Sequence, residues 1–392
     1  MVAARRSVRR AVSRPVLRSA LARLHRWLGL SLGLLLALIG LSGSMMLFER
    51  PFDAALNPAL FHNLVPCAAQ LDVGGAVGAV RERWPDATVE MVTMPLRAGA
   101  PYRIAFQAPG VAENEAMADS CSGFLLGSRA RGRIALDPVH LMPLLQRWHH
   151  SLLQGQVGRA ALGYLGLVWL AALLAGLALA KPAPGRGEGR GRGAWRRALG
   201  IRLDRGGLRA SRDLHRVLGL LALPLLSLAA FTGFSSGLPE LSRSLVGQFT
   251  EVGGEHRRIA RPALAVDEES ISWNEARSIA EQHLSDGATL VALSRLPERG
   301  LFQARLRRVD DWQRTGTLRL FIDLRRGEIV DTVNPIGGRG GDRFLAALFP
   351  LHSGQFGGAP GRCLMAFAGI LPSLFLISGV AGWILRRQTR RA

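Results

Sequence analysis

Lysine, cysteine and nucleotide-binding motifs are scarce or absent in this chain of 392 residues. Lys181 is the only lysine, so arginine supplies nearly all of the basic charge behind the formal net charge of +21. The sequence contains no glycine-rich turn between a strand and a helix, no P-loop and no H-E-x-x-H. These absences exclude a recognisable nicotinamide, flavin or nucleoside triphosphate module and the common zinc-protease site.

Cysteine is limited to Cys67, Cys121 and Cys363, and no C-x-x-C motif occurs. A thiol redox function is therefore not expected. Cys67 and Cys121 fall in one segment, where they either form a disulfide in an oxidising compartment or lie together by accident of composition. Cys363 stands at the head of an apolar run, and we interpret it as structural.

Long apolar runs, in contrast, are abundant. Hydrophobic residues make up 48% of the chain and charged residues only 20%, which is unusual for a soluble domain. Four runs reach the length of about 20 residues that a helix needs to cross a bilayer core of ~30 Å; they are 27–48, 162–180, 217–238 and 363–385. The basic flank of the first run also suits a signal peptide, but the run continues past normal signal length without a clear cleavage site. We interpret it as an uncleaved anchor.

The arginines lie in blocks beside these runs rather than along one face, which argues against nucleic acid as a partner. Short loops rich in arginine stay in the cytoplasm, so we expect 1–26, 181–216 and 386–392 to be cytoplasmic. The segments 49–148 and 239–351 then face the periplasm, if the source is a Gram-negative bacterium, and the protein lies in the inner membrane. The loop 181–216 either binds RNA or anionic lipid or, as we expect, is a flexible linker.

Two spacing patterns indicate that the chain is built from two copies of one unit. LHRWLGL at 24–30 precedes the first run, and LHRVLGL at 214–220 precedes the third. A hydroxyl residue and a glycine follow both histidines at the same distance, as Ser42-Gly43 and Thr232-Gly233. His149 and His352, before the second and fourth runs, are each followed nine and ten residues later by a Gly-Arg pair.

The predicted fold is therefore an α-helical integral membrane protein with four transmembrane helices in two repeats and two external α+β domains. The second and fourth helices, with external extensions, are expected over 149–180 and 352–385. A straight helix over 149–180 would exceed the membrane core, so it either projects beyond the bilayer or bends within QGQVGR.

The repeated histidines are the candidate ligands of a metal or cofactor. His25 and His215 stand at the cytoplasmic entrances of their helices, and His149 and His352 stand at the external entrances, so each side holds one pair. Imidazole suits zinc, copper, iron and haem iron, but no carboxylate or cysteine accompanies the pairs to complete a zinc site. Two histidines from facing helices suit the axial positions of a b-type haem, which predicts two haems.

Arg26 and Arg216 directly follow two of these histidines. Either they pair with haem propionates or they serve only the positive-inside rule. The remaining histidines lie outside the repeat pattern, and we expect them to be surface residues: His62, His140, His256 and His283.

The external segments show mixed periodicity. In the second, ISWNEARSIAEQHL predicts a helix, and LFQARLRR and TLRLFIDL predict strands. In the first, AVGAVRERW predicts a helix, and YRIAF and GRIALDP predict strands. The stretch 109–127 between those strands is interpreted as an insertion, either a specialised ligand surface or, as we expect, a plain loop.

At LHRWLGL, LHRVLGL, the Ser-Gly and Thr-Gly pairs, His149 with its Gly-Arg pair, and HSGQFGGAPGR, the chain resembles the PepSY-associated transmembrane proteins over nearly its whole length. Asp323 before Arg-Arg-Gly is similar to the aspartate and turn glycine near the end of a PepSY module. Members of this family include inner-membrane reductases that release iron from ferric siderophores with two membrane haems. The resemblance thus implies external PepSY-like domains and a ferric siderophore or other Fe(III) chelate as substrate.

Two functions remain open at this point. The first is a haem-dependent ferric reductase that takes electrons from quinol or a cytoplasmic reductase. The second is a non-enzymatic membrane sensor or accessory protein whose PepSY-like domains bind a partner.

Overall fold

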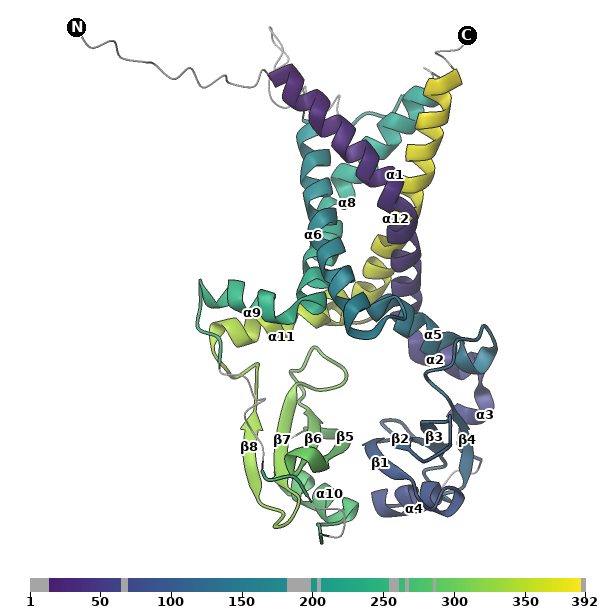
Figure 1. Cartoon of the computed structure of the whole chain (residues 1–392), viewed down its shortest axis with the longest axis vertical. Coiled ribbons are helices and arrows are strands. Elements are labelled where there is room, and N and C mark those ends of the chain that lie inside the picture. Colours follow the sequence, from purple (N-terminus) through teal and green to yellow (C-terminus); the bar gives the residue numbers. More distant parts are fainter. Residues whose placement is uncertain are drawn as a thin grey trace, which may run out of the picture. The chain divides into compact units, whose positions relative to one another are not determined.

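The computed structural model describes residues 14–64, 70–181, 199–202, 206–253, 261–264, 268–284 and 287–388. They fall into two compact units (Figure 1). The helical unit comprises Met1–Ser44, Leu162–Phe234 and Met365–Ala392, and the sheet unit comprises Met45–Ala161 and Ser235–Leu364.

Four long helices are apolar enough to cross a membrane: α1 (Arg14–Met46), α6 (Gly155–Ala180), α8 (Gly207–Gly237) and α12 (Gly358–Gln388). Their most apolar windows have mean hydropathies of 1.9 to 2.1. The chain is a membrane protein. The helices α1 and α8 begin well before the predicted runs, so His25 and His215 lie inside helices and not at their first residues.

Small residues bring the helices of this unit into close contact. Gly40 of α1 lies against Gly369 of α12, where a Cβ on Gly369 would come within 2.6 Å of the Gly40 carbonyl oxygen. One turn further on, Ser44 Oγ donates a hydrogen bond to the Ala366 carbonyl across the same crossing, at 2.8 Å. In lipid, close backbone packing and such hydrogen bonds hold helices together, because burial of apolar surface gives little advantage there.

A second crossing joins α6 to α8. A Cβ on Gly166 would lie 2.8 Å from the Ala230 carbonyl oxygen. Gly40 and Ala230 each come fifteen residues after their histidine in LHRxLGL, and Gly166 and Gly369 each come seventeen residues after His149 and His352. The two crossings therefore occupy the same places relative to the repeated histidines.

The sheet unit contains eight strands: β1 (Thr88–Thr93), β2 (Tyr102–Gln107), β3 (Glu115–Ala118), β4 (Leu125–Arg129), β5 (Thr289–Leu296), β6 (Leu301–Arg307), β7 (Leu318–Asp323) and β8 (Ile329–Val333). Their order is β4-β3-β2-β1-β5-β6-β7-β8, and every pair is antiparallel. The sheet joins the segments 49–148 and 239–351, which the sequence predicted as separate domains. The junction is β1 against β5, with Val92 opposite Leu293; without it, each half would leave an apolar edge strand unpaired.

Two amphipathic helices, α4 (Val73–Arg83) and α10 (Trp273–Gln282), share one apolar core with strands of both halves. Asp72 caps α4 by accepting from Gly75 N–H at 2.7 Å, and Ser272 caps α10 within a capping box. Asn274 connects the two helix starts, since its Oδ1 accepts from Gly74 N–H and its Nδ2 donates to Asp72.

Two expectations for the segment 49–148 were wrong. The stretch 109–127, interpreted as an insertion, contains β3 and the start of β4, and GRIALDP at 132–138 forms no strand. The turn after β3 has the same chemistry as the turn after β7. Asp119 accepts hydrogen bonds from Cys121 and Ser122 N–H groups, and Asp323 accepts them from Arg325 and Arg326 N–H groups; each turn ends in a glycine with positive φ four residues later.

Shorter helices complete the sheet unit: α2 (Glu49–Leu56), α3 (Pro58–Phe61), α5 (Pro138–Ser151), α9 (Pro239–Gly247) and α11 (Gly340–His352). A buried ionic network lies between α2 and the sheet. Arg129 binds Asp53 at 2.9 Å and Glu115 at 2.6 Å, and all three side chains are at most 5% exposed. Burial alone would raise the pKa of Glu115, but Arg103, Arg129 and Arg131 lower it to about 2.

The chain bends between α5 and α6. Leu152 and Leu153 adopt left-handed backbone conformations, and so does Gly155. The segment 149–180 therefore comprises the last turn of α5 and the whole of α6. The predicted bend exists, but it lies at Leu152–Gly155, mostly just before QGQVGR, which is largely helical. Gly158, the glycine of the first Gly-Arg pair, packs against the Ser151 carbonyl with no room for a Cβ. The spacing from histidine to Gly-Arg thus has a steric reason.

Candidate haem-binding histidine pairs

The helical unit brings His25 of α1 and His215 of α8 together. Their ring centroids are 6.3 Å apart, and the ring planes are nearly perpendicular, at 88°. Both side chains are half-buried. Phe375 of α12 stacks edge-on against His215, with centroids 5.1 Å apart.

One nitrogen of each ring in this pair is held by a neighbouring helix. His25 Nδ1–H donates to the Ala172 carbonyl at 3.0 Å, and a carbonyl can only accept, so Nδ1 carries the proton. His215 Nδ1 lies 2.9 Å from Ser378 Oγ, which itself donates to the Phe375 carbonyl. The hydroxyl therefore accepts from His215 Nδ1–H. In both rings Nε2 keeps its lone pair for a metal, as is usual for ligating histidines.

The sheet unit brings His149 of α5 and His352 of α11 together. Their ring centroids are 6.2 Å apart, with 40° between the planes. Each histidine belongs to the last turn of its helix, directly before the backbone turns left-handed, at Leu152 and at Gly354. His150 lies beside His149, with ring centroids 5.7 Å apart. Desolvation, and then the charge of His150, lower the pKa of His352 to about 4, so this ring is neutral at pH 7.

Both separations fit one iron between two imidazoles. With metal–nitrogen bonds of about 2 Å, two imidazoles that hold one metal ion between them would have ring centroids about 6 Å apart. Gly29, one turn after His25, has open space where a Cβ would be, and a Cβ on Gly219, one turn after His215, would meet only Phe375 at 4.0 Å. Within the described ranges, no three His, Cys, Asp or Glu residues group as a bare metal site would require. The two ring separations, and the space beside His25 and His215, are of the size that a haem between each pair would need.

A comparison with protein families places the chain. The model described as PepSY-associated TM region matches residues 22–386. The chain belongs to this family. No curated protein matches the chain. The predicted family is thus confirmed, whereas the ferric reductase activity, the haems and their ligands stay predictions.

In this PepSY-associated transmembrane protein, the two predicted propionate partners differ. Arg216 donates to the buried carboxylate of Asp213 at 2.8 Å and so has a protein partner already. Arg26 is exposed, and it forms no hydrogen bond or ion pair with any part of the chain that the structure describes. Pairing with a propionate remains a prediction for both.

The expectation that the other histidines lie at the surface is wrong for His140. Its side chain is largely buried, and Nδ1 contacts the N-cap Asp137 at 2.8 Å, so it stabilises the start of α5. His62 and His283 are exposed, and His256 lies outside the described residues. Cys121 is disulfide-bonded, while Cys67 also lies outside the described residues; Cys363 is a free, exposed thiol.

Sequence reasoning missed a group of arginines in the sheet unit. Desolvation and then four other arginines lower the pKa of Arg314; the four are Arg362, Arg50, Arg97 and Arg307. The backbone N–H of Arg314 donates to Gln355 Oε1 at 2.7 Å, three residues beyond His352. We call these five residues the arginine cluster. Its members come from separate segments, so no local sequence pattern announces it.

Proposed function

We propose that this protein is a di-haem reductase of the bacterial inner membrane that passes electrons to a periplasmic ferric siderophore or other Fe(III) chelate and releases Fe(II). The observation that carries the proposal is the pair of ring separations, 6.3 and 6.2 Å, each of which suits one iron between two histidines. His25 with His215 would hold one b-type haem, and His149 with His352 the other. A bound haem supplies one-electron redox chemistry.

In the proposed orientation, both termini and the 181–216 loop lie in the cytoplasm and the sheet unit lies in the periplasm. The chain would consist of two repeats of one unit. The arginine blocks support the orientation. Two observations support the repeat: the strand order of one half mirrors that of the other, and the two helix crossings have equal offsets from the repeated histidines. Reporter fusions at Ala130 and Asp310 should be exported, while a fusion at Gly193 should not. A cytoplasmic signal at Ala130 or Asp310 would refute the orientation.

The chain's own residues prepare the ligands. The Ala172 carbonyl and the Ser378 hydroxyl hold Nδ1–H of His25 and His215, which orients each ring and keeps Nε2 free of a proton. In the other pair, desolvation keeps His352 neutral. Because the chain has no nucleotide motif, we expect quinol or a cytoplasmic reductase to deliver the electrons.

The arginine cluster suits a negatively charged substrate. Its guanidinium groups repel one another, so an anion that enters among them relieves the repulsion. Fe(III) chelates of carboxylates and catecholates carry negative charge. Reduction weakens the chelate, since hard oxygen ligands hold Fe(III) more tightly than Fe(II), and release of iron follows.

The test is anaerobic mixing of the purified full chain, reduced with dithionite, with ferric siderophores and a ferrous-specific chromophore. We expect sharp low-spin bands before mixing, then haem reoxidation with formation of ferrous iron. In His352→Ala, haem reoxidation and ferrous iron formation should both be lost. His283→Ala, which removes an exposed histidine outside the pairs, should retain both.

Two results would contradict the proposal. Colourless protein from haem-replete cells would favour the sensor or accessory function. Red protein whose haem stays reduced with a panel of ferric chelates would require another electron acceptor.

A further inference from the structure

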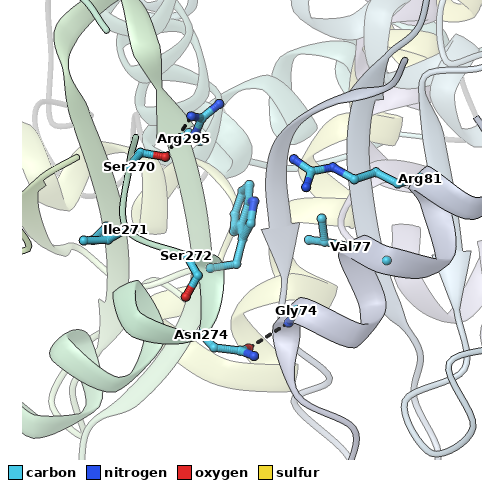
Figure 2. A pocket seen from close by; sticks show the side chains of 10 residues that line it. Gly74, Val77, Arg81, Ser270, Ile271, Ser272, Asn274 and Arg295 are labelled. Carbon is cyan, nitrogen blue, oxygen red and sulfur yellow. Dashed lines mark hydrogen bonds between the residues drawn. The ribbon is translucent and has the colours of Figure 1, made fainter. Parts of the chain in front are cut away.

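A pocket of about 300 Å³ lies in the sheet unit, where the first turns of α4 and α10 meet (Figure 2). That volume is at the lower end of sites that bind small molecules. Its lining consists of Gly74, Val77, Gly78, Arg81, Ser270, Ile271, Ser272, Trp273, Asn274 and Arg295. No residue of α5 or α11 takes part, so the pocket is distinct from the histidine pair of this unit.

Two arginines give the pocket its charge. Arg81 comes from α4 and Arg295 from β5, and both side chains border the pocket from different walls (Figure 2). Arg295 Nη2 donates to Ser270 Oγ at 3.1 Å. Desolvation and then the charge of Arg81 lower the pKa of Arg295. In the part of the chain that the structure describes, neither guanidinium has an ion-pair partner.

The carboxylates of Asp72 and Glu275, at the starts of α4 and α10, have other partners. Asp72 accepts from Gly75 N–H and from Asn274 Nδ2. Glu275 accepts from Ser272 N–H at 2.6 Å as part of the capping box. Each carboxylate is thus used to start a helix, and among the described residues neither of them forms an ion pair with Arg81 or Arg295.

The rest of the wall is apolar and contains one unsatisfied donor. Val77 and Ile271 line the pocket together with the indole of Trp273, which is 6% exposed. Trp273 Nε1–H is buried without an acceptor among the described residues. A buried donor left unpaired is unfavourable, and an acceptor oxygen of a ligand in the pocket would satisfy it.

We propose that this pocket binds a small organic carboxylate with an apolar body. The carboxylate lies between Arg81 and Arg295, where the charge-assisted hydrogen bonds of a guanidinium are strong. The body packs on Val77, Ile271 and the Trp273 ring. Since both α4 and α10 contribute, the ligand stabilises the junction between the two halves of the sheet.

The test is calorimetric titration of the full chain in nanodiscs with benzoate, phthalate, neutral benzamide and inorganic phosphate. We expect saturable binding of benzoate or phthalate and at least about tenfold weaker binding of benzamide. Arg81→Gln and Arg295→Gln should each weaken carboxylate binding about tenfold or more, while Arg295→Lys keeps the charge and should weaken it less. Trp273→Phe, which keeps an aromatic ring but removes the N–H, should weaken it by a smaller factor.

The matched control is Arg83→Gln, which removes the same charge from the same helix; Arg83 stacks on Trp84 and does not line the pocket. It should change the affinity less than about twofold. Equal weakening by Arg81→Gln and Arg83→Gln would overturn the proposal, because it would mean a nonspecific charge effect. Binding of phosphate alone, equal binding of benzamide, or no binding up to about 10 mM would overturn it as well. Unchanged thermal unfolding verifies that each variant is folded. The pocket test does not depend on the proposed function, because carboxylate binding is measured separately from the haem spectrum.

Discussion

The helical unit and the sheet unit each hold one histidine pair, and the two ring separations differ by only 0.1 Å, at 6.3 and 6.2 Å. The surroundings differ far more. His25 and His215 lie within long helices, and neighbouring helices fix their Nδ1 atoms. His149 and His352 lie in the last turns of short helices, each followed by a left-handed turn.

This contrast indicates which property of the pairs is constrained. The separation of the rings is common to both units, whereas the means of holding them is not. The helical unit places its rings with glycine crossings between helices. In the sheet unit, the rings are placed by the ends of α5 and α11. The arginine cluster adds positive charge to the same unit. In the proposed function, the sheet-unit pair would pass electrons to an anionic substrate, and the helical-unit pair would transfer electrons within the membrane.

The largest expected effect comes from removing ligands of one pair at a time. His215→Ala or His352→Ala should each remove about half of the haem, because in the proposed function each pair would bind one haem independently. The double variant His25→Ala with His215→Ala should lose no more than either single change. Combining His215→Ala with His352→Ala should remove nearly all haem, measured by pyridine haemochrome per protein. If the His25 and His215 double variant loses all haem while His149→Ala loses none, two independent sites are refuted.

The four spans and the four histidines were predictable because their signals are local. A run of apolar residues can be found from the sequence alone, and so can histidines that recur with the same neighbours at the same spacing. The joined sheet was not predictable, since the pairing of Val92 with Leu293 connects residues two hundred positions apart. The matching turns, DSCSG and DLRRG, were a usable signal for β3 and β4 that the interpretation of 109–127 as an insertion overlooked.

Other features depend on packing that the sequence does not specify. The chain has 46 glycines, so the crossing at Gly40 and Gly369 cannot be told from the others by type. The arginine cluster gathers side chains from separate segments. His140 reads as a surface histidine until its contact with Asp137 is seen.

The next largest effect is a difference in the acid sensitivity of the two units' stability. The pKa of Glu115 is lowered from 4.5 to about 2 in the folded sheet unit, so its stabilisation is complete above pH 4.5 and is lost as the pH falls toward 2. The loss amounts to about 3 kcal/mol. Unfolding of the strands at pH 3, monitored by infrared spectroscopy, should occur at lower denaturant concentration than at pH 7, with helix signals less affected. Glu115→Gln should flatten this dependence, and an unchanged pH response in that variant would assign it to other groups.

A smaller effect tests the crossings of the helical unit. A Cβ on Gly369 would come within 2.6 Å of the Gly40 carbonyl oxygen, so Gly369→Ala must move α1 and α12 apart and should cost about 1–3 kcal/mol. Gly379→Ala, on the same helix but facing open space, should be neutral or slightly stabilising. Thermal unfolding in detergent compares the two. Equal effects would mean that the crossing does not contribute, and a specific loss of the His25–His215 haem in Gly369→Ala would tie the crossing to the ring separation.

The smallest expected effect concerns a single hydrogen bond in the helical unit. Ser378 Oγ accepts from His215 Nδ1–H at 2.9 Å, which would make Nε2 a stronger donor to the iron of a bound haem and would favour its ferric state. Ser378→Ala removes the acceptor, so one of two reduction potentials should rise by about 40 mV, the equivalent of about 1 kcal/mol for one electron. Ser373→Ala is the matched control on the same helix, because the Ser373 hydroxyl is buried without a partner among the described residues. Potentiometric titration of the haem bands measures both variants. A shift of both potentials, or a shift of equal size in Ser373→Ala, would show that the hydrogen bond to His215 does not tune one site selectively.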